Sequence, residues 1–307
     1  MMILHTILAA LGPIILGVAV GWGTGKTGFI KKEYTQALAD YVIKIALPLA
    51  LFLAAAQSSP SILLNLDYMF VLAAGLFLTY AIGFISGKIF FKHTNKDAAM
   101  QAFCTSFPDM AYCGPPVLLA VVGTSGLIAM VIGNLIYTVI IIPFTLLIIN
   151  STGKNGIIKS IWGAVKQPLV FLPITGAIIA LLGIKLPEVV QNSINELGET
   201  AGGVALFFLG LLISTIKMSV NFEIIFNVFV KNFVQAAIIL GAALLVGLEG
   251  DLLKSAFIIG ILPTASAVPA LAVGNKAYEN LSTGTVFLST IMALVSIAVG
   301  ITIIDMI

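Results

Sequence analysis

Residues 107–123, FPDMAYCGPPVLLAVVG, place several prolines inside one apolar run, and residues 262–274, LPTASAVPALAVG, repeat the pattern. The prolines of the two stretches are Pro108, Pro115, Pro116, Pro263 and Pro269. Proline lacks an amide hydrogen and clashes with the carbonyl four residues earlier, so it breaks or kinks a helix. Both stretches are therefore predicted to be helices that are interrupted in the middle of an apolar span.

Each proline leaves a backbone carbonyl without its helical partner. The carbonyls expected to be freed belong to Cys104, Ala111, Tyr112, Ile259 and Ala265. An unsatisfied polar group in hydrocarbon costs several kcal/mol, and irregular backbone at membrane depth occurs where it is buried in protein or lines a cavity. Simple kinks are the alternative interpretation, but two paired clusters at matching depth favour a binding site.

The composition indicates that lipid is the solvent of this chain. Apolar residues make up 60% of its 307 residues and charged residues 9%, against about 25% charged in soluble domains. The net charge of +2 is too small and dispersed to suggest nucleic acid as a partner. We expect an all-α integral membrane protein that needs no cofactor and no metal.

A hydrocarbon core about 30 Å thick needs roughly 20 apolar residues per helix, and the sequence contains ten such runs. Their approximate limits are 3–22, 36–56, 68–90, 97–122, 126–149, 166–183, 198–217, 225–247, 252–274 and 282–304. The apolar N-terminus is interpreted as a retained span and not as a signal peptide.

The two halves of the chain, 1–150 and 151–307, resemble each other. GPIILG around Pro13 resembles LPITG around Pro173, LPLALF at 47–52 resembles GGVALF at 202–207, and the two proline stretches match. Chance similarity between apolar helices is the alternative. Three matches in the same order, five spans apart, predict two five-helix repeats, and the odd number inverts the second copy.

Lysine placement predicts the orientation, since cytoplasmic connections are enriched in basic residues. Every basic residue is lysine, and the connections after the odd-numbered spans hold most of them: Lys26, Lys31, Lys32, Lys88, Lys92, Lys96, Lys154, Lys159, Lys217 and Lys276. Lys166 and Lys231 are assigned to span starts on the same side, and Lys185 and Lys254 to the opposite side. We therefore expect both termini outside, in the plasma membrane.

The residues around the breaks predict an anion site. Pro115 and Pro269 suit the first turn of a helix, so the second half of each broken span should begin near the midplane with its positive dipole end. The candidate substrate-binding residues are Asp109, Met110, Cys113, Gly114, Pro115, Asn134, Thr264, Ser266 and Pro269. An interhelical hydrogen bond is the alternative role of Asn134.

Two charges stand inside predicted spans, and each would cost about 2.5–3.5 kcal/mol if left unpaired. These are Asp109 and Lys44, and the repeat alignment places Glu199 at the position of Lys44. The expected partners of the two charges are each other, Asp40, Glu199, a ligand or water. Lys44 could instead extend towards the inner surface.

The chain resembles the auxin efflux carrier family over its whole length. The resemblance is clearest in the two proline stretches, in IALPLALF of span 2 and in KQPLVFLPITGAIIALLGIKLP of span 6. That family includes plant carriers and prokaryotic malate and malonate permeases. The resemblance implies ten spans in two inverted repeats, with substrate at a crossover of broken helices, as in NhaA-type antiporters and bile-acid symporters. The family commonly has Asn where this chain has Asp109.

The expected function is elevator-type transport of a small organic anion, with a carboxylate favoured and with a proton or sodium as coupling ion. By resemblance, spans 1, 2, 6 and 7 form a scaffold and spans 3–5 and 8–10 a moving domain. An anion channel and a sodium-coupled symporter of an amphipathic acid are the alternatives. The lipid bilayer is the medium, and homodimerisation is left open.

A membrane enzyme is disfavoured. The GTGKT string at 23–27 has Val20 where a phosphate loop requires glycine. The two histidines, His5 and His93, are expected at opposite membrane faces, so a catalytic dyad with serine or cysteine is not expected.

Overall fold

The computed structural model describes residues 2–60, 64–110, 113–150, 166, 168–215 and 220–304. Over these residues the chain is helical, and they contain no β-strand beyond one isolated antiparallel bridge between Pro108 and Thr264. The prediction of an all-α fold is therefore confirmed for the described part of the chain.

The helices follow one another with short connections. In the first half they are α1 (Met2–Thr27), α2 (Thr35–Tyr41), α3 (Leu47–Ala56), α5 (Leu66–Ile89), α6 (Asn95–Ser106), α7 (Gly114–Val121), α8 (Thr124–Ile136) and α9 (Ile142–Asn150). In the second half they are α11 (Pro168–Leu181), α12 (Glu188–Gly198), α13 (Thr200–Thr215), α14 (Phe222–Phe229), α15 (Gln235–Leu245), α16 (Gly250–Ile261), α17 (Val268–Asn275) and α18 (Glu279–Ile304).

Three of these connections are single π-helical turns, so the helices on either side form one continuous rod. The turns are Val42–Ala46 between α2 and α3, Tyr137–Ile141 between α8 and α9, and Val230–Val234 between α14 and α15. A π-turn inside an α-helix shifts the backbone pairing and is frequent at functional sites.

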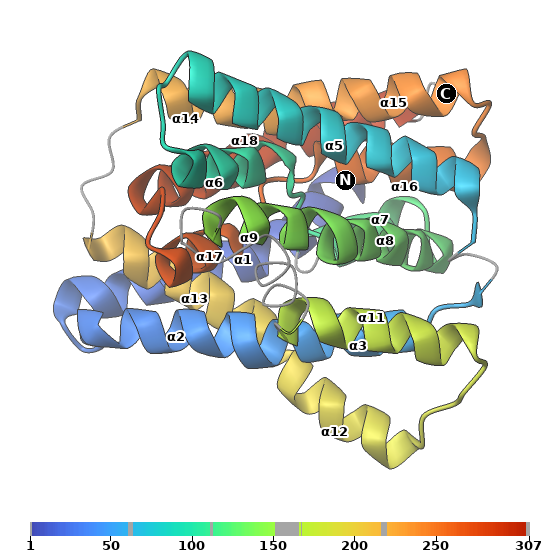
Figure 1. The fold of residues 1–307 in the computed structure, drawn as a ribbon, viewed down its shortest axis with the longest axis horizontal. Helices are drawn as coiled ribbons and strands as arrows, with labels where there is room; N and C mark the ends of the chain where they lie inside the picture. Colours follow the sequence, from blue (N-terminus) through green and yellow to red (C-terminus); the bar gives the residue numbers. More distant parts are fainter. Residues whose placement is uncertain are drawn as a thin grey trace.

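The chain passes back and forth along the long axis of the molecule (Figure 1). The connections after α1, α5 and α17 gather at one end, on the left in that view, and those after α11 and α15 at the other. We call the first end the lysine-rich end, because Lys26, Lys88 and Lys276 lie at the ends of α1, α5 and α17.

Five helices in the described part of the chain are long and apolar enough to cross a membrane: Thr35–Ala56, Leu66–Ile89, Ala129–Ile149, Glu188–Ser214 and Phe222–Leu245. A sixth is added if α18 counts as one bent span. The two proline-broken spans fall short by this measure because their halves, α6, α7, α16 and α17, have 8 to 12 residues each. The count of ten spans stays a prediction.

The helices pack in two sets. In one, α1 lies against α13, and α3 lies against α11 and α12. In the other, α5 packs on α6 and α15, and α16 packs on α8, α15 and α18. Large apolar side chains such as Leu245 and Phe70 stay exposed on the outside, where lipid tails would cover them.

The contact between α1 and α13 depends on glycine. A Cβ atom added to Gly21 would lie 2.0 Å from the carbonyl oxygen of Phe207, and one added to Gly210 would lie 2.1 Å from that of Val18. Small residues let helix backbones approach this closely in membranes, where packing replaces the hydrophobic effect as the force between helices.

We expect Gly210→Ala to destabilise the protein by about 1–3 kcal/mol, because α1 must move to admit the methyl group. Gly203→Ala on the same helix is the matched control, since its Cβ would meet nothing within 4 Å. Thermal unfolding in detergent measures both variants. Equal midpoints for the two would contradict this account of the contact.

Candidate functional site

The two proline stretches meet inside the molecule. The first break lies between Ser106, where α6 ends, and Gly114, where α7 begins; the second lies between Ile261 and Val268, the facing ends of α16 and α17. Both interruptions agree with the sequence prediction. Pro115 and Pro269 stand in the first turns of α7 and α17, as expected, and Pro116 follows Pro115.

The broken segments are joined by backbone hydrogen bonds. The amide of Asp109 donates to the carbonyl of Pro263, and the amide of Ala265 donates to the carbonyl of Phe107, each at 2.8 Å. These bonds flank the antiparallel bridge between Pro108 and Thr264. We call this paired region the crossing, and its pairing satisfies part of the backbone that the prolines release.

Side chains satisfy other released groups. The carbonyl of Cys104, predicted to be freed by Pro108, accepts the hydroxyl of Thr264 at 2.9 Å. The carbonyl of Ser106 accepts a hydrogen bond from the side-chain amide of Gln235 at 2.8 Å. The amide of Thr264 donates to the hydroxyl of Ser289 at 2.9 Å. The crossing is therefore held by polar side chains from α15 and α18.

Lys231 is the main correction to the sequence analysis. It was assigned to a span start at the membrane surface, but it lies well inside the helix Phe222–Leu245 and is fully buried. Its ammonium donates to the carbonyl of Leu262 at 2.7 Å and approaches that of Gly260 at 3.4 Å. The assignment was wrong because the helix begins earlier than predicted, so Lys231 does not count towards the orientation.

Asp109 is buried at the crossing, and its charge interacts with that of Lys231. The backbone supports this proximity, since the partners of Lys231 and Asp109 are the consecutive carbonyls of Leu262 and Pro263. A buried cation and a buried carboxylate thus share the region where the two breaks meet.

The other two predicted charges lie elsewhere. Lys44 is exposed and forms an ion pair with Asp40 at 2.9 Å, which was one of its expected partners. The carboxylate of Glu199 accepts a hydrogen bond from the side-chain amide of Asn195 at 2.6 Å. For Asp109, the structure adds Lys231 as a charged neighbour that the sequence analysis did not consider.

A cavity of about 360 Å³ adjoins the crossing. Three residues singled out from the sequence line it, namely Met110 in the first break, Asn134 on α8 and Glu199 between α12 and α13. The opposite wall comes from α3 and α12, and its residues are Leu47, Ala50, Leu51, Leu53, Ala54, Asn195 and Gly198. Met130 and Gln57 complete the lining.

Most of the remaining predicted residues are buried at the crossing. Cys113 and Gly114 are buried, and a Cβ on Gly114 would meet the sulfur of Met130 at 2.8 Å. Thr264 is engaged with the carbonyl of Cys104. The buried hydroxyl of Ser266 has no hydrogen-bond partner among the described residues.

The α14–α15 rod has a polar face that was not predicted from the sequence. Its members recur every four residues, which places them on one side of a helix: Glu223, Asn227, Lys231 and Gln235. All four are buried. This spacing inside an otherwise apolar span was the available signal. A second missed element is Tyr137, whose ring stacks on Phe107 with centroids 3.9 Å apart.

Residues 6–301 match the family described as membrane transport protein, which covers nearly the whole chain. The chain belongs to the auxin efflux carrier family of membrane transporters. This confirms the resemblance drawn from the sequence and places the chain among transporters, not enzymes.

Three relatives illustrate the family. The chain is similar to the uncharacterized transporter YfdV of Escherichia coli (26% identity, 91% of each chain covered). It is similar to a putative malonate transporter of Rhizobium meliloti (19%, with 85% of this chain and 84% of the relative covered). It also resembles auxin efflux carrier component 7 of Arabidopsis thaliana (29%, with 40% of this chain and 21% of the relative covered).

We expect Thr264→Val to destabilise the protein by about 1–3 kcal/mol, because the buried carbonyl of Cys104 loses its hydrogen bond. Thr264→Ser should retain most of the stability. Thr290→Val is the matched control, since that hydroxyl bonds only to the Val286 carbonyl of its own helix. A thermal midpoint for Thr264→Val equal to that of Thr290→Val would contradict the assigned role.

Proposed function

We propose that this protein is a secondary active transporter of a small organic anion, with a carboxylate as the favoured substrate class. Membership of a transporter family supports the general function. The observation that carries the finer proposal is a fully buried lysine at the crossing of two broken helices, next to a cavity. In this proposal the substrate binds between the cavity and the crossing.

The chemistry of the crossing suits an anion. Helices α7 and α17 both begin there, and a helix N-terminus presents unpaired amides and a partial positive charge. In its protonated form, Lys231 adds a positive charge in a region from which water is largely excluded, where electrostatic attraction is stronger than in water. A carboxylate could also accept a hydrogen bond from the free hydroxyl of Ser266.

Asp109 would couple transport to a proton. An ionised Asp109 competes with an anionic substrate for Lys231, so the substrate and the charged carboxylate oppose each other. A proton on Asp109 removes that competition and leaves Lys231 to hold the substrate. Binding of the anion and of the proton therefore favour each other, which is the requirement for symport. Sodium is the alternative coupling ion.

The packing supports an elevator mechanism. We propose ten spans in two inverted repeats, 1–150 and 151–307, with spans 1, 2, 6 and 7 as the scaffold and spans 3–5 and 8–10 as the moving domain. The cavity has walls from both parts, because α3 and α12 belong to the first and α8 and Met110 to the second. Sliding of one part along the other would expose such a site alternately to the two sides.

Uptake into proteoliposomes tests the function. Mono- and dicarboxylates, including malonate because one relative is named as a putative malonate transporter, are offered with and without pH and sodium gradients. We expect saturable uptake of at least one carboxylate, accelerated by a pH gradient. Liposomes without protein are the control. Unitary currents in planar bilayers would instead favour a channel, and absence of saturable uptake would contradict the proposal.

We expect Asp109→Asn to lose pH-driven accumulation while it retains exchange of labelled for unlabelled substrate. The amide keeps the size of the side chain but cannot bind a proton. Asp40→Asn is the matched control, since Asp40 is partly exposed and paired with Lys44. If Asp109→Asn accumulates substrate with the wild-type dependence on pH and sodium, the residue has a structural role.

A further inference from the structure

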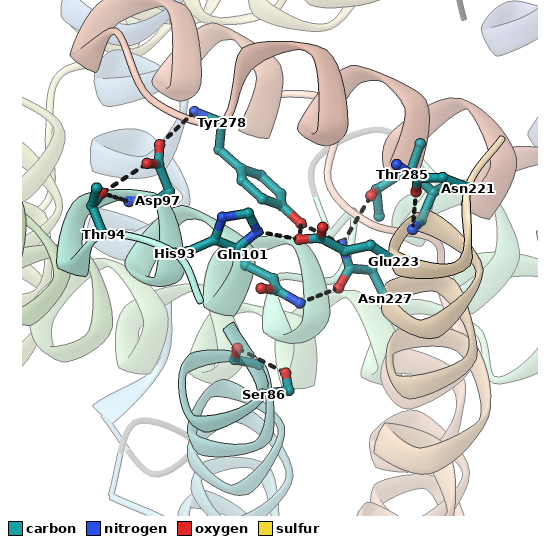
Figure 2. Close-up of polar contacts among 12 residues, drawn as sticks. Ser86, His93, Thr94, Asp97, Gln101, Asn221, Glu223, Asn227, Tyr278 and Thr285 are labelled. Carbon is teal, nitrogen blue, oxygen red and sulfur yellow. Dashed lines mark hydrogen bonds and ion pairs between the residues drawn. The ribbon is translucent and has the colours of Figure 1, made fainter. Parts of the chain in front are cut away.

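A second polar cluster, shown in Figure 2, surrounds the start of α14. The rod that begins with this helix also carries Lys231. The centre of the cluster is Glu223 in the first turn of α14, whose side chain is 10% exposed. One carboxylate oxygen, Oε1, contacts Nε2 of His93 at 2.6 Å and also accepts the hydroxyl of Tyr278. A carboxylate and an imidazole thus share one short contact near the protein surface.

The partners of Glu223 come from two connections, and both are held in place. His93 lies between α5 and α6; its amide donates to the carbonyl of Gly87, and Lys88 donates to the His93 carbonyl at 2.9 Å. Tyr278 lies between α17 and α18, where its amide donates to Asp97. Tyr278 has a φ of 58°, which is uncommon for a bulky residue and indicates that the surroundings fix its position.

Polar contacts continue from Glu223 towards the crossing. The amide of Asn227, one turn further along α14, donates to Tyr278 at 3.0 Å and to Thr285 at 3.2 Å. The side chain of Asn227 accepts a hydrogen bond from the side-chain amide of Gln101. The side-chain oxygen of Gln101, Oε1, is buried and has no partner among the described residues. Lys231 follows one turn later. The polar face of α14–α15 therefore links the surface cluster to the crossing.

A structural ion pair is the simpler interpretation of this cluster, but burial argues against it as the whole explanation. Buried ion pairs contribute little net stability, because removing the charges from water costs as much as the attraction returns. His93 remains 20% exposed, so protons from water can reach it. Histidine is also the side chain whose charge normally changes between about pH 5 and pH 8.

We propose that Glu223 and His93 form a proton-binding site, separate from the crossing, that exchanges one proton with the water at the lysine-rich end. A proton donated by water-borne acid binds either to the imidazole or to the carboxylate. The pair then changes from a net charge of −1 to zero, and the donor keeps the electron pair. Its role in transport rests on the proposed function.

The charged and titratable neighbours of the pair come from every element packed around it. They are Tyr278 between α17 and α18, Asp97 and Cys104 on α6, and Lys88 at the end of α5. Glu223 and Lys231 lie eight residues apart on one continuous rod, roughly 12 Å at 1.5 Å per residue. We expect a change of charge at the surface site to alter the electrostatic field at Lys231 over this distance.

Exchange in proteoliposomes, measured at equal pH on both sides, tests the role in transport. We expect wild-type exchange to vary between about pH 5 and pH 8, and Glu223→Gln and His93→Gln each to shift the pH range of this dependence, because each leaves one of the two titratable groups without its partner. The double variant lacks both titratable groups, so it should lose the part of the pH dependence that comes from this site. Glu279→Gln, which removes an exposed carboxylate at the same end of the molecule, should keep the wild-type profile. Wild-type profiles in both single variants would overturn the proposal.

Nitrogen-15 NMR tests the site without any substrate, so it separates failure of this proposal from failure of the proposed function. The chain has two histidines, and His5→Gln leaves His93 as the one reporter. We expect its imidazole signal to titrate, and Glu223→Gln to shift that titration. If Glu223→Gln does not fold, Tyr278→Phe, which keeps the ring against His93, should shift it instead. An imidazole signal that is constant over this pH range, or a titration that is unchanged in the folded variants, would overturn the proposal.

Discussion

Two stretches of backbone leave the helical hydrogen-bond pattern inside the apolar part of this chain, and the groups they free must find other partners there. Each break supplies some of the hydrogen-bond partners of the other, in the backbone bonds that join Asp109 to Pro263 and Ala265 to Phe107. Thr264, Gln235 and Lys231 supply further partners. The arrangement of the surrounding helices follows from this need, because α15 and α18 must lie close enough for their side chains to reach the crossing.

The same partners give the crossing its chemistry. A lysine that satisfies freed carbonyls also brings a positive charge to the place where two helices begin, and Asp109 brings the opposite charge. In the proposed function, the groups that satisfy the freed backbone are also the groups that recognise the anion. The cavity beside the crossing has one wall from each set of helices, so relative movement of the sets would change access to it.

The polar face of the α14–α15 rod extends this logic to the surface. Each of its four buried side chains contacts a different part of the protein, from His93 at the lysine-rich end to Ser106 at the crossing. Such a face is costly in a membrane span unless every member has a partner. The rod therefore joins the loops between helices at the lysine-rich end to the broken helices in the interior.

The sequence by itself determined the membrane class, the positions of both breaks, the helix starts at Pro115 and Pro269, and the family. These depend on composition and on local proline chemistry, which act over a few residues. Tertiary structure alone decided the burial of Lys231 and the hydrogen bond from Thr264 to the Cys104 carbonyl. The last contact joins residues 160 positions apart, and no local pattern specifies which side chain will reach a freed carbonyl. That choice is made when the helices pack.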